Sequence, residues 1–105
     1  MGTFENSCCY CGKCLSITHP DFTKEHLIPK SKGGNNFLIN KKPCCKNCNS
    51  WRGNQTFSQF KVNVAYCLNN NIFENGYTKY DYFVMIENID YWKWIVETDL
   101  RKFKK

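Results

Sequence analysis

The 105-residue chain lacks long hydrophobic runs, and this absence limits where the protein can work. No stretch approaches the roughly 18 apolar residues that a membrane-spanning helix needs, so we expect no membrane partner. Residues 1–14 also lack an apolar segment of signal-peptide length. A lipid anchor at Gly2 is disfavoured, because Asn6 stands where N-myristoylation requires Ser or Thr. The sequence therefore predicts a cytoplasmic protein, in a reducing compartment.

Acidic residues are few compared with basic ones. Nine Asp and Glu stand against 15 Lys and Arg, and the formal net charge is +6. Such an excess attracts polyanions, because Lys and Arg release counterions when they bind phosphates. The same excess also serves solubility alone, so charge by itself does not identify a partner.

Cysteine, in contrast, is abundant: the chain has eight, and its length predicts a single domain over residues 1–105. A domain of this size buries a small core and often needs a metal or a disulfide to be stable. Disulfides persist in oxidising compartments, so the predicted location favours metal-bound thiolates and free thiols.

Two Cys-x-x-Cys pairs, Cys8/Cys11 and Cys45/Cys48, lie far apart in the sequence. Each pair presents two sulfurs to one ion, and two pairs complete the tetrahedral four-sulfur shell that structural Zn²⁺ prefers. A closed shell has no open position, so this zinc would be structural. The alternative is a set of buried free thiols or a redox-active pair.

The choice of ligands within each pair stays open. Cys11/Cys14 has the same spacing as the first pair. Gly12 favours the first pair, because a glycine there allows the tight turn of a zinc-binding knuckle. The neighbours that compete with the chosen ligands are Cys9 and Cys44.

By composition the chain has two parts, residues 1–56 and residues 57–105. The second part is apolar at helical spacing, which predicts one helix over residues 57–68 and a last helix over residues 79–102. The predicted core face of the last helix consists of Tyr80, Phe83, Val84, Ile89, Trp92, Ile95, Val96 and Phe103.

The first part has shorter predicted elements. Residues 22–28 are expected to form a strand, residues 31–36 a loop, and residues 37–40 the returning strand. A helix is expected to begin within residues 45–52, with Asn47 and Asn49 as candidate caps. The order strand, loop, strand, helix lies between the two cysteine pairs.

Five features of this part follow one another along the chain. They are the first cysteine pair, the step Glu25-His26, a Gly-Gly loop, the central Asn40, and a Cys-x-x-Cys-Asn run with the basic Arg52 three residues on. In this order they resemble the HNH endonuclease family of the ββα-metal superfamily, in its four-cysteine zinc subtype. The resemblance covers about half the chain, up to Gly53. It implies an α+β fold, with a zinc-stapled ββα-metal core and a C-terminal helical extension.

The resemblance also implies an activity, which is metal-dependent hydrolysis of DNA phosphodiester bonds. It gives His26 as the general base and Asn40 as the residue that holds the hairpin and orients that histidine. Glu25 and Asn49 would bind one catalytic Mg²⁺ or Mn²⁺, which is consistent with the preference of hard cations for oxygen ligands. An imidazole with a pKa near neutrality can accept a proton from water. Unlike many members, the chain has Glu at position 25 and Asn at position 49, so the motif reads His-Asn-Asn.

Contact with nucleic acid is expected from basic residues around this site. Arg52 matches a basic position that can meet phosphate, and Lys30 and Lys32 flank the Gly-Gly loop. Such contacts position the backbone and carry little sequence information. Trp51 could stack on a sugar or a base, but packing against the helix is the simpler expectation. Three further lysines surround the predicted site, namely Lys41, Lys42 and Lys46.

Two other interpretations compete with the nuclease. One is a non-catalytic zinc-containing nucleic-acid-binding module with a structural His26, and the other is a zinc-bound protein-interaction module. Richness in Lys and Asn suggests an AT-rich genome such as that of a phage or mobile element. The protein would then act in the host cytoplasm, with DNA and other phage or host proteins as partners. The sequence leaves open the oligomeric state, the sequence specificity, and whether one strand or both are cut.

Overall fold

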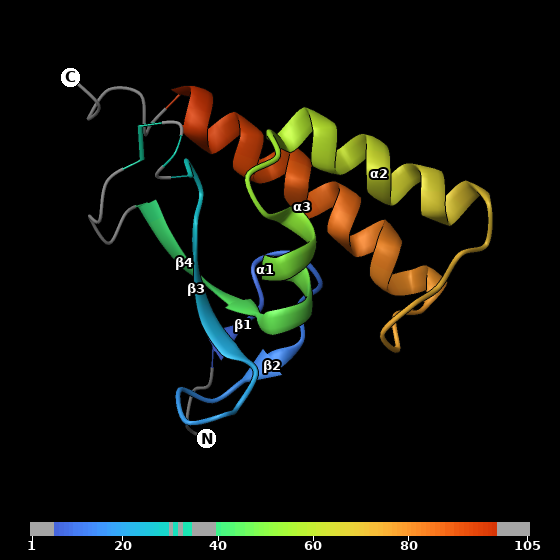
Figure 1. Ribbon diagram of the computed structural model, residues 1–105, viewed down its shortest axis with the longest axis horizontal. Coiled ribbons are helices and arrows are strands. Elements are labelled where there is room, and N and C mark those ends of the chain that lie inside the picture. Colours follow the sequence, from blue (N-terminus) through green and yellow to red (C-terminus); the bar gives the residue numbers. More distant parts are fainter. Residues whose placement is uncertain (1–5, 30, 32, 35–39, 99–105) are drawn as a thin grey trace.

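The computed structural model describes residues 6–29, 31, 33–34 and 40–98. In this part of the chain the fold is α+β, as predicted, with two small antiparallel sheets and three helices (Figure 1). The first sheet pairs two short strands near the N-terminus, and the second is a longer hairpin followed directly by a helix. The elements are β1 (Asn6–Ser7), β2 (Cys14–Leu15), β3 (Phe22–His26), β4 (Lys41–Cys45), α1 (Lys46–Arg52), α2 (Phe57–Asn69) and α3 (Lys79–Thr98).

The hairpin of β3 and β4 carries the Glu-His step at the end of its first strand. The register pairs Phe22 with Cys45 and His26 with Lys41. The predicted strand over residues 22–28 is confirmed for its first five residues. The returning strand was expected at residues 37–40, but β4 begins at Lys41, and residues 37–39 lie outside the described part. The sequence of β4 is Lys-Lys-Pro-Cys-Cys, which lacks alternation and contains a proline. Proline is tolerated there because a two-stranded sheet has only edge strands.

Helix α1 follows β4 without a loop. Its N-cap is Cys45, whose sulfur accepts a hydrogen bond from the backbone N–H of Cys48 at 3.5 Å. The candidate caps Asn47 and Asn49 are therefore wrong, since both lie inside the helix. This cap places Cys45 and Cys48, the two cysteines of the second pair, close together at the start of α1.

Strands β1 and β2 were not predicted. Each has two residues, which is too short for a periodic pattern, and the turn between them contains the first cysteine pair. The backbone N–H of Gly12 donates to the carbonyl of Cys8 at 3.0 Å, and Gly12 has a φ of 82°. An L-residue rarely adopts that φ, so the expected role of this glycine in a tight turn is confirmed.

Helices α2 and α3 run antiparallel, side by side, above the hairpin and α1 (Figure 1). Helix α2 matches its predicted span. Thr56 caps it in a reciprocal arrangement with Gln59, in which each side chain accepts from the other's backbone N–H. Its buried face is formed by Phe57, Phe60 and Val64.

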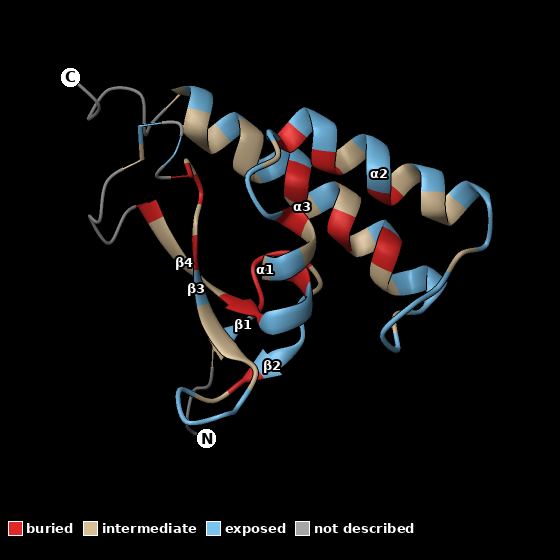
Figure 2. Ribbon diagram, in the orientation of Figure 1, coloured by how far each residue is buried: buried red, intermediate tan, exposed pale blue. Residues whose placement is uncertain are grey.

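The predicted core face of α3 is partly wrong. Tyr80 and Phe83 are 74% and 51% exposed, whereas Tyr82 and Met85 are buried along with the predicted Ile89. Both sets have helical spacing, so periodicity could not choose between them; Figure 2 shows the buried band of α3 turned toward α2. Of the remaining predicted core residues, Val84 is of intermediate burial, and Trp92, Ile95 and Val96 pack partly buried against the core. Phe103 lies outside the described residues.

Helix α3 also contacts the N-terminal turn directly. The side chain of Asn88 donates to the carbonyl of Tyr10 at 2.6 Å, and the indole N–H of Trp92 donates to the carbonyl of Cys9 at 2.7 Å. The helical part therefore fixes the backbone of the turn that carries the first cysteine pair. Over the described residues, no helix is both long and apolar enough to cross a membrane.

Candidate active site

Four sulfurs gather where the N-terminal turn meets the start of α1. The thiols of Cys8, Cys11, Cys45 and Cys48 all lie within 4.8 Å of one another, and the sulfurs of Cys11 and Cys45 are 3.9 Å apart. A tetrahedral zinc with Zn–S bonds of about 2.3 Å places its sulfurs about 3.8 Å apart. The four cysteines therefore fit structural Zn²⁺, and they are the four that the sequence favoured.

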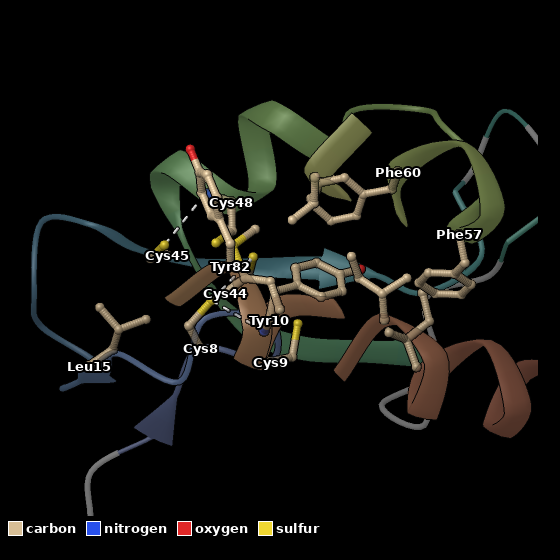
Figure 3. Packing of buried hydrophobic residues seen from close by; sticks show 14 residues of the cluster. Cys8, Cys9, Tyr10, Leu15, Cys44, Cys45, Cys48, Phe57, Phe60 and Tyr82 are labelled. Carbon is tan, nitrogen blue, oxygen red and sulfur yellow. Dashed lines mark hydrogen bonds between the residues drawn. The ribbon is translucent and has the colours of Figure 1, made fainter. Parts of the chain in front are cut away.

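The competing cysteines fall outside this cluster. Cys14 is exposed, whereas Cys9 and Cys44 are buried beside the cluster without joining it (Figure 3). A hydrogen bond with the Cys11 thiol lowers the pKa of Cys45 to about 7. A thiol with that pKa is about half ionised at neutral pH, and the thiolate is the form that binds metal.

A pocket of about 220 Å³ lies between the end of β3 and the middle of α1. It is lined by three of the predicted site residues, Glu25, His26 and Asn49, so the fold brings them together. Glu25 and His26 are the last two residues of β3, and Asn49 is the fourth residue of α1. The remaining lining residues are Lys24, Pro29, Gly53 and Asn54.

The amide of Asn49 is oriented by the hairpin. Its nitrogen donates to the hydroxyl of Thr23 at 2.8 Å, and that hydroxyl donates to the carbonyl of Cys44 at 2.7 Å. Since the nitrogen is engaged with β3, the oxygen is the atom of the amide that can bind a cation.

Asn40 closes the segment that follows β3. Its side-chain oxygen accepts from the N–H of Ile28 at 2.9 Å, its side-chain nitrogen donates to the carbonyl of Ile28 at 3.2 Å, and its own carbonyl accepts from the N–H of Leu27. Asn40 is 2% exposed. It thus fixes the backbone next to His26, and it is not among the residues that line the pocket.

The second glycine of the Gly-Gly loop packs against the same segment. The N–H of Gly34 donates to the carbonyl of Pro29 at 2.9 Å, and a Cβ at Gly34 would overlap the carbonyl of Ile28. The second glycine of the Gly-Gly motif is therefore required for a steric reason, because any side chain at position 34 would overlap this carbonyl.

Replacing Gly34 with alanine is expected to destabilise the protein by about 1–3 kcal/mol, because a backbone carbonyl must move to admit the methyl group. Thermal unfolding followed by circular dichroism measures this loss. Gly76→Ala is the matched control: Gly76 has a φ of 80° but nothing within 4 Å, so it reports backbone strain without overlap. A smaller loss for Gly34→Ala than for Gly76→Ala would contradict the steric argument.

The structure contradicts the expected phosphate contact of Arg52. This residue is 1% exposed, and its guanidinium donates to Oε2 of Glu25 at 2.6 Å and to the carbonyl of His26 at 3.2 Å. A side chain so buried cannot reach DNA, so Arg52 supports the site from within. Lys30 and Lys32 lie outside the described residues.

Lys24 is the basic residue of the pocket that sequence reasoning missed. It is exposed and lines the pocket. Residues two apart on a strand share a face, so the position of Lys24 relative to His26 was a usable signal. Trp51, in contrast, packs inside as expected, with its ring 5.7 Å from Phe60 and 5.6 Å from Tyr82.

Glu25 is a buried carboxylate with two donors. It is 4% exposed, and its Oε2 accepts from the hydroxyl of Tyr10 at 2.7 Å as well as from Arg52. Burial raises the pKa of Glu25, and the hydrogen bonds from Tyr10 and Arg52 act in the opposite direction. Tyr10 was not among the predicted site residues, since it lies between two cysteines and far from Glu25 in sequence.

A family model described as HNH endonuclease matches residues 8–65, more than half of the chain. The chain belongs to the HNH endonuclease family. The matched span contains both cysteine pairs, the β3–β4 hairpin, α1 and most of α2, whereas α3 lies beyond it. Membership indicates a nuclease-type function on a nucleic-acid substrate. No curated protein and no solved structure matches the chain.

Proposed function

We propose that this member of the HNH endonuclease family hydrolyses DNA phosphodiester bonds, with His26 as general base and one divalent ion bound by Glu25 and Asn49. The observation that carries the proposal is their meeting in one pocket of about 220 Å³, at the junction of β3 and α1. An imidazole, a carboxylate and an amide oxygen are the groups that the reaction needs side by side.

In the proposed reaction His26 takes a proton from the attacking water. The new bond joins the water oxygen to phosphorus, and the bond from phosphorus to the 3′ oxygen breaks, which leaves a 5′-phosphate and a 3′-hydroxyl once the 3′ oxygen gains a proton from solvent. Glu25 and Asn49 supply oxygen ligands of the type that Mg²⁺ and Mn²⁺ prefer. An ion held by these two residues would neutralise charge on the scissile phosphate and would stabilise the leaving oxygen.

The neighbouring residues have supporting roles in this proposal. Lys24 is exposed at the pocket and carries the positive charge that attracts a phosphate, in place of the buried Arg52. Asn40 keeps the backbone beside His26 in place through its bonds to Ile28. The zinc held by the four cysteines is structural, because a four-thiolate shell leaves no open position for substrate.

The test uses supercoiled plasmid and the zinc-loaded protein. We expect nicked or linear DNA with Mg²⁺ or Mn²⁺ and intact plasmid with EDTA. Asn49→Ala removes one of two ion ligands and is expected to lower the cleavage rate about 10- to 100-fold. Asn47→Ala is the matched control, since Asn47 is an exposed asparagine on the same helix.

The two variants separate the nuclease from its main competitor. A non-catalytic nucleic-acid-binding module would retard plasmid on a gel and leave it intact under every metal condition. Cleavage that persists in Asn49→Ala at the rate of Asn47→Ala would show that the ion is bound elsewhere.

A further inference from the structure

We propose that Tyr10 is a positioning residue for the catalytic ion, and that it links the zinc-binding turn to the active pocket. The inference rests on the proposed function, because it concerns how Glu25 is presented to that ion. Tyr10 lies between two zinc-binding cysteines in the sequence, yet its hydroxyl reaches the carboxylate on β3.

Tyr10 is fixed through both its ring and its backbone. It is 0% exposed, and its ring meets that of Phe60 edge-on at 5.2 Å. Its backbone N–H donates to the sulfur of Cys8 at 3.4 Å, and its carbonyl accepts from Asn88. In Figure 3 it lies between the sulfurs of the cysteine cluster and the rings of Phe57 and Phe60. A hydroxyl carried on so fixed a ring defines the position of whatever it donates to.

What it donates to is one oxygen of the proposed ion ligand. The hydroxyl of Tyr10 and the guanidinium of Arg52 both reach Oε2 of Glu25, at 2.7 and 2.6 Å. With both donors on Oε2, the other oxygen, Oε1, is the one that can serve an ion in the pocket. Carboxylates that bind metal ions are commonly oriented by such outer hydrogen bonds.

Arg52 also links the Glu25 carboxylate to the backbone of His26, the proposed general base. The guanidinium that shares Oε2 with Tyr10 also donates to the carbonyl of His26 and, through its Nε, to the carbonyl of Gln55. Arg52 further stacks on the ring of Phe57, with its guanidinium carbon 4.1 Å from the ring centre. A shift of Tyr10 would therefore be transmitted to Glu25 and to the strand end that carries His26.

Tyr10→Phe tests the inference, because it removes the hydroxyl and keeps the ring. We expect Mn²⁺ to bind the zinc-loaded variant about 10-fold more weakly than wild type. Electron paramagnetic resonance of free Mn²⁺ measures this affinity without reference to catalysis. Zinc content should stay at the wild-type value, because no sulfur is changed.

Tyr82→Phe is the matched control. Tyr82 is also buried, at 1% exposure, and its hydroxyl also donates a hydrogen bond, to the carbonyl of Ile72 at 3.0 Å. Both variants are expected to lower Tm by a similar amount, and only Tyr10→Phe is expected to change Mn²⁺ affinity. Equal Mn²⁺ affinity in the two variants would overturn the inference while leaving the proposed function intact.

Failure of the proposed function gives a different pattern. In that case wild type and Asn49→Ala would bind the same amount of Mn²⁺, and the plasmid would stay intact. That result overturns the inference as well, since there would be no catalytic ion for Tyr10 to position.

Discussion

Replacing Cys48 with serine is expected to abolish the cooperative unfolding transition and release the zinc. Cys48 is 0% exposed, and its sulfur belongs to the four-sulfur cluster. Structural zinc contributes about 10–16 kcal/mol of apparent binding free energy in zinc-finger peptides. A small domain has only about 5–15 kcal/mol of net stability. Loss of the zinc-binding free energy is therefore expected to unfold it. Metal analysis of the purified protein and circular dichroism melting measure both effects.

Cys14→Ser is the control for this prediction, because Cys14 has the same spacing from Cys11 as Cys8 but is exposed. It should keep the zinc and a wild-type Tm. Retention of zinc by Cys48→Ser would mean that Cys48 is not a ligand. Loss of zinc in Cys14→Ser would mean that the N-terminal turn binds the ion through a different pair of sulfurs.

Replacing His26 with alanine is expected to reduce DNA cleavage by about 10²–10⁴-fold, the usual contribution of a general base. The imidazole lines the pocket with Glu25 and Asn49, and no cysteine ligand is altered. Zinc content, Tm and DNA affinity should therefore remain near wild type. The initial rate of plasmid nicking in Mg²⁺ gives the first quantity, and gel retardation in EDTA gives the DNA affinity.

His19→Ala provides the comparison, since the chain has one other histidine. His19 is an exposed residue whose Nδ1 accepts a bond from the backbone N–H of Asp21 in a turn. It should cut DNA at the wild-type rate. If His26→Ala cleaves as fast as His19→Ala, the general base is another group.

Much of the fold and of the site could be predicted because spacing constrains geometry. Two Cys-x-x-Cys pairs predict a shared four-sulfur shell, and the four sulfurs do gather in the structure. The stripe of Phe57, Phe60 and Val64 similarly specified α2, since residues at helical spacing share one face. These inferences needed only local sequence.

The predictions for Arg52 and for the buried face of α3 failed because they depended on long-range neighbours. Arg52 looked like a surface cation, and only its approach to Glu25, 27 residues away, makes it a buried one. Helix α3 has aromatic residues around most of its circumference. Which of them are buried is decided by where α2 and the N-terminal turn press against it, as the exposed Tyr80 and the buried Tyr82 show. Position along a helix does not carry that information.

The two hydrogen bonds between α3 and the N-terminal turn affect the order in which the chain folds. Asn88 and Trp92 are separated by 78 and 83 residues from the carbonyls that they bond. These two bonds cannot form until Asn88 and Trp92 have been synthesised, long after the first cysteine pair. Contacts of such long sequence separation form slowly. The N-terminal turn therefore gains these two bonds late in folding, and a chain truncated before α3 would hold the turn only through its contacts with the hairpin and α1.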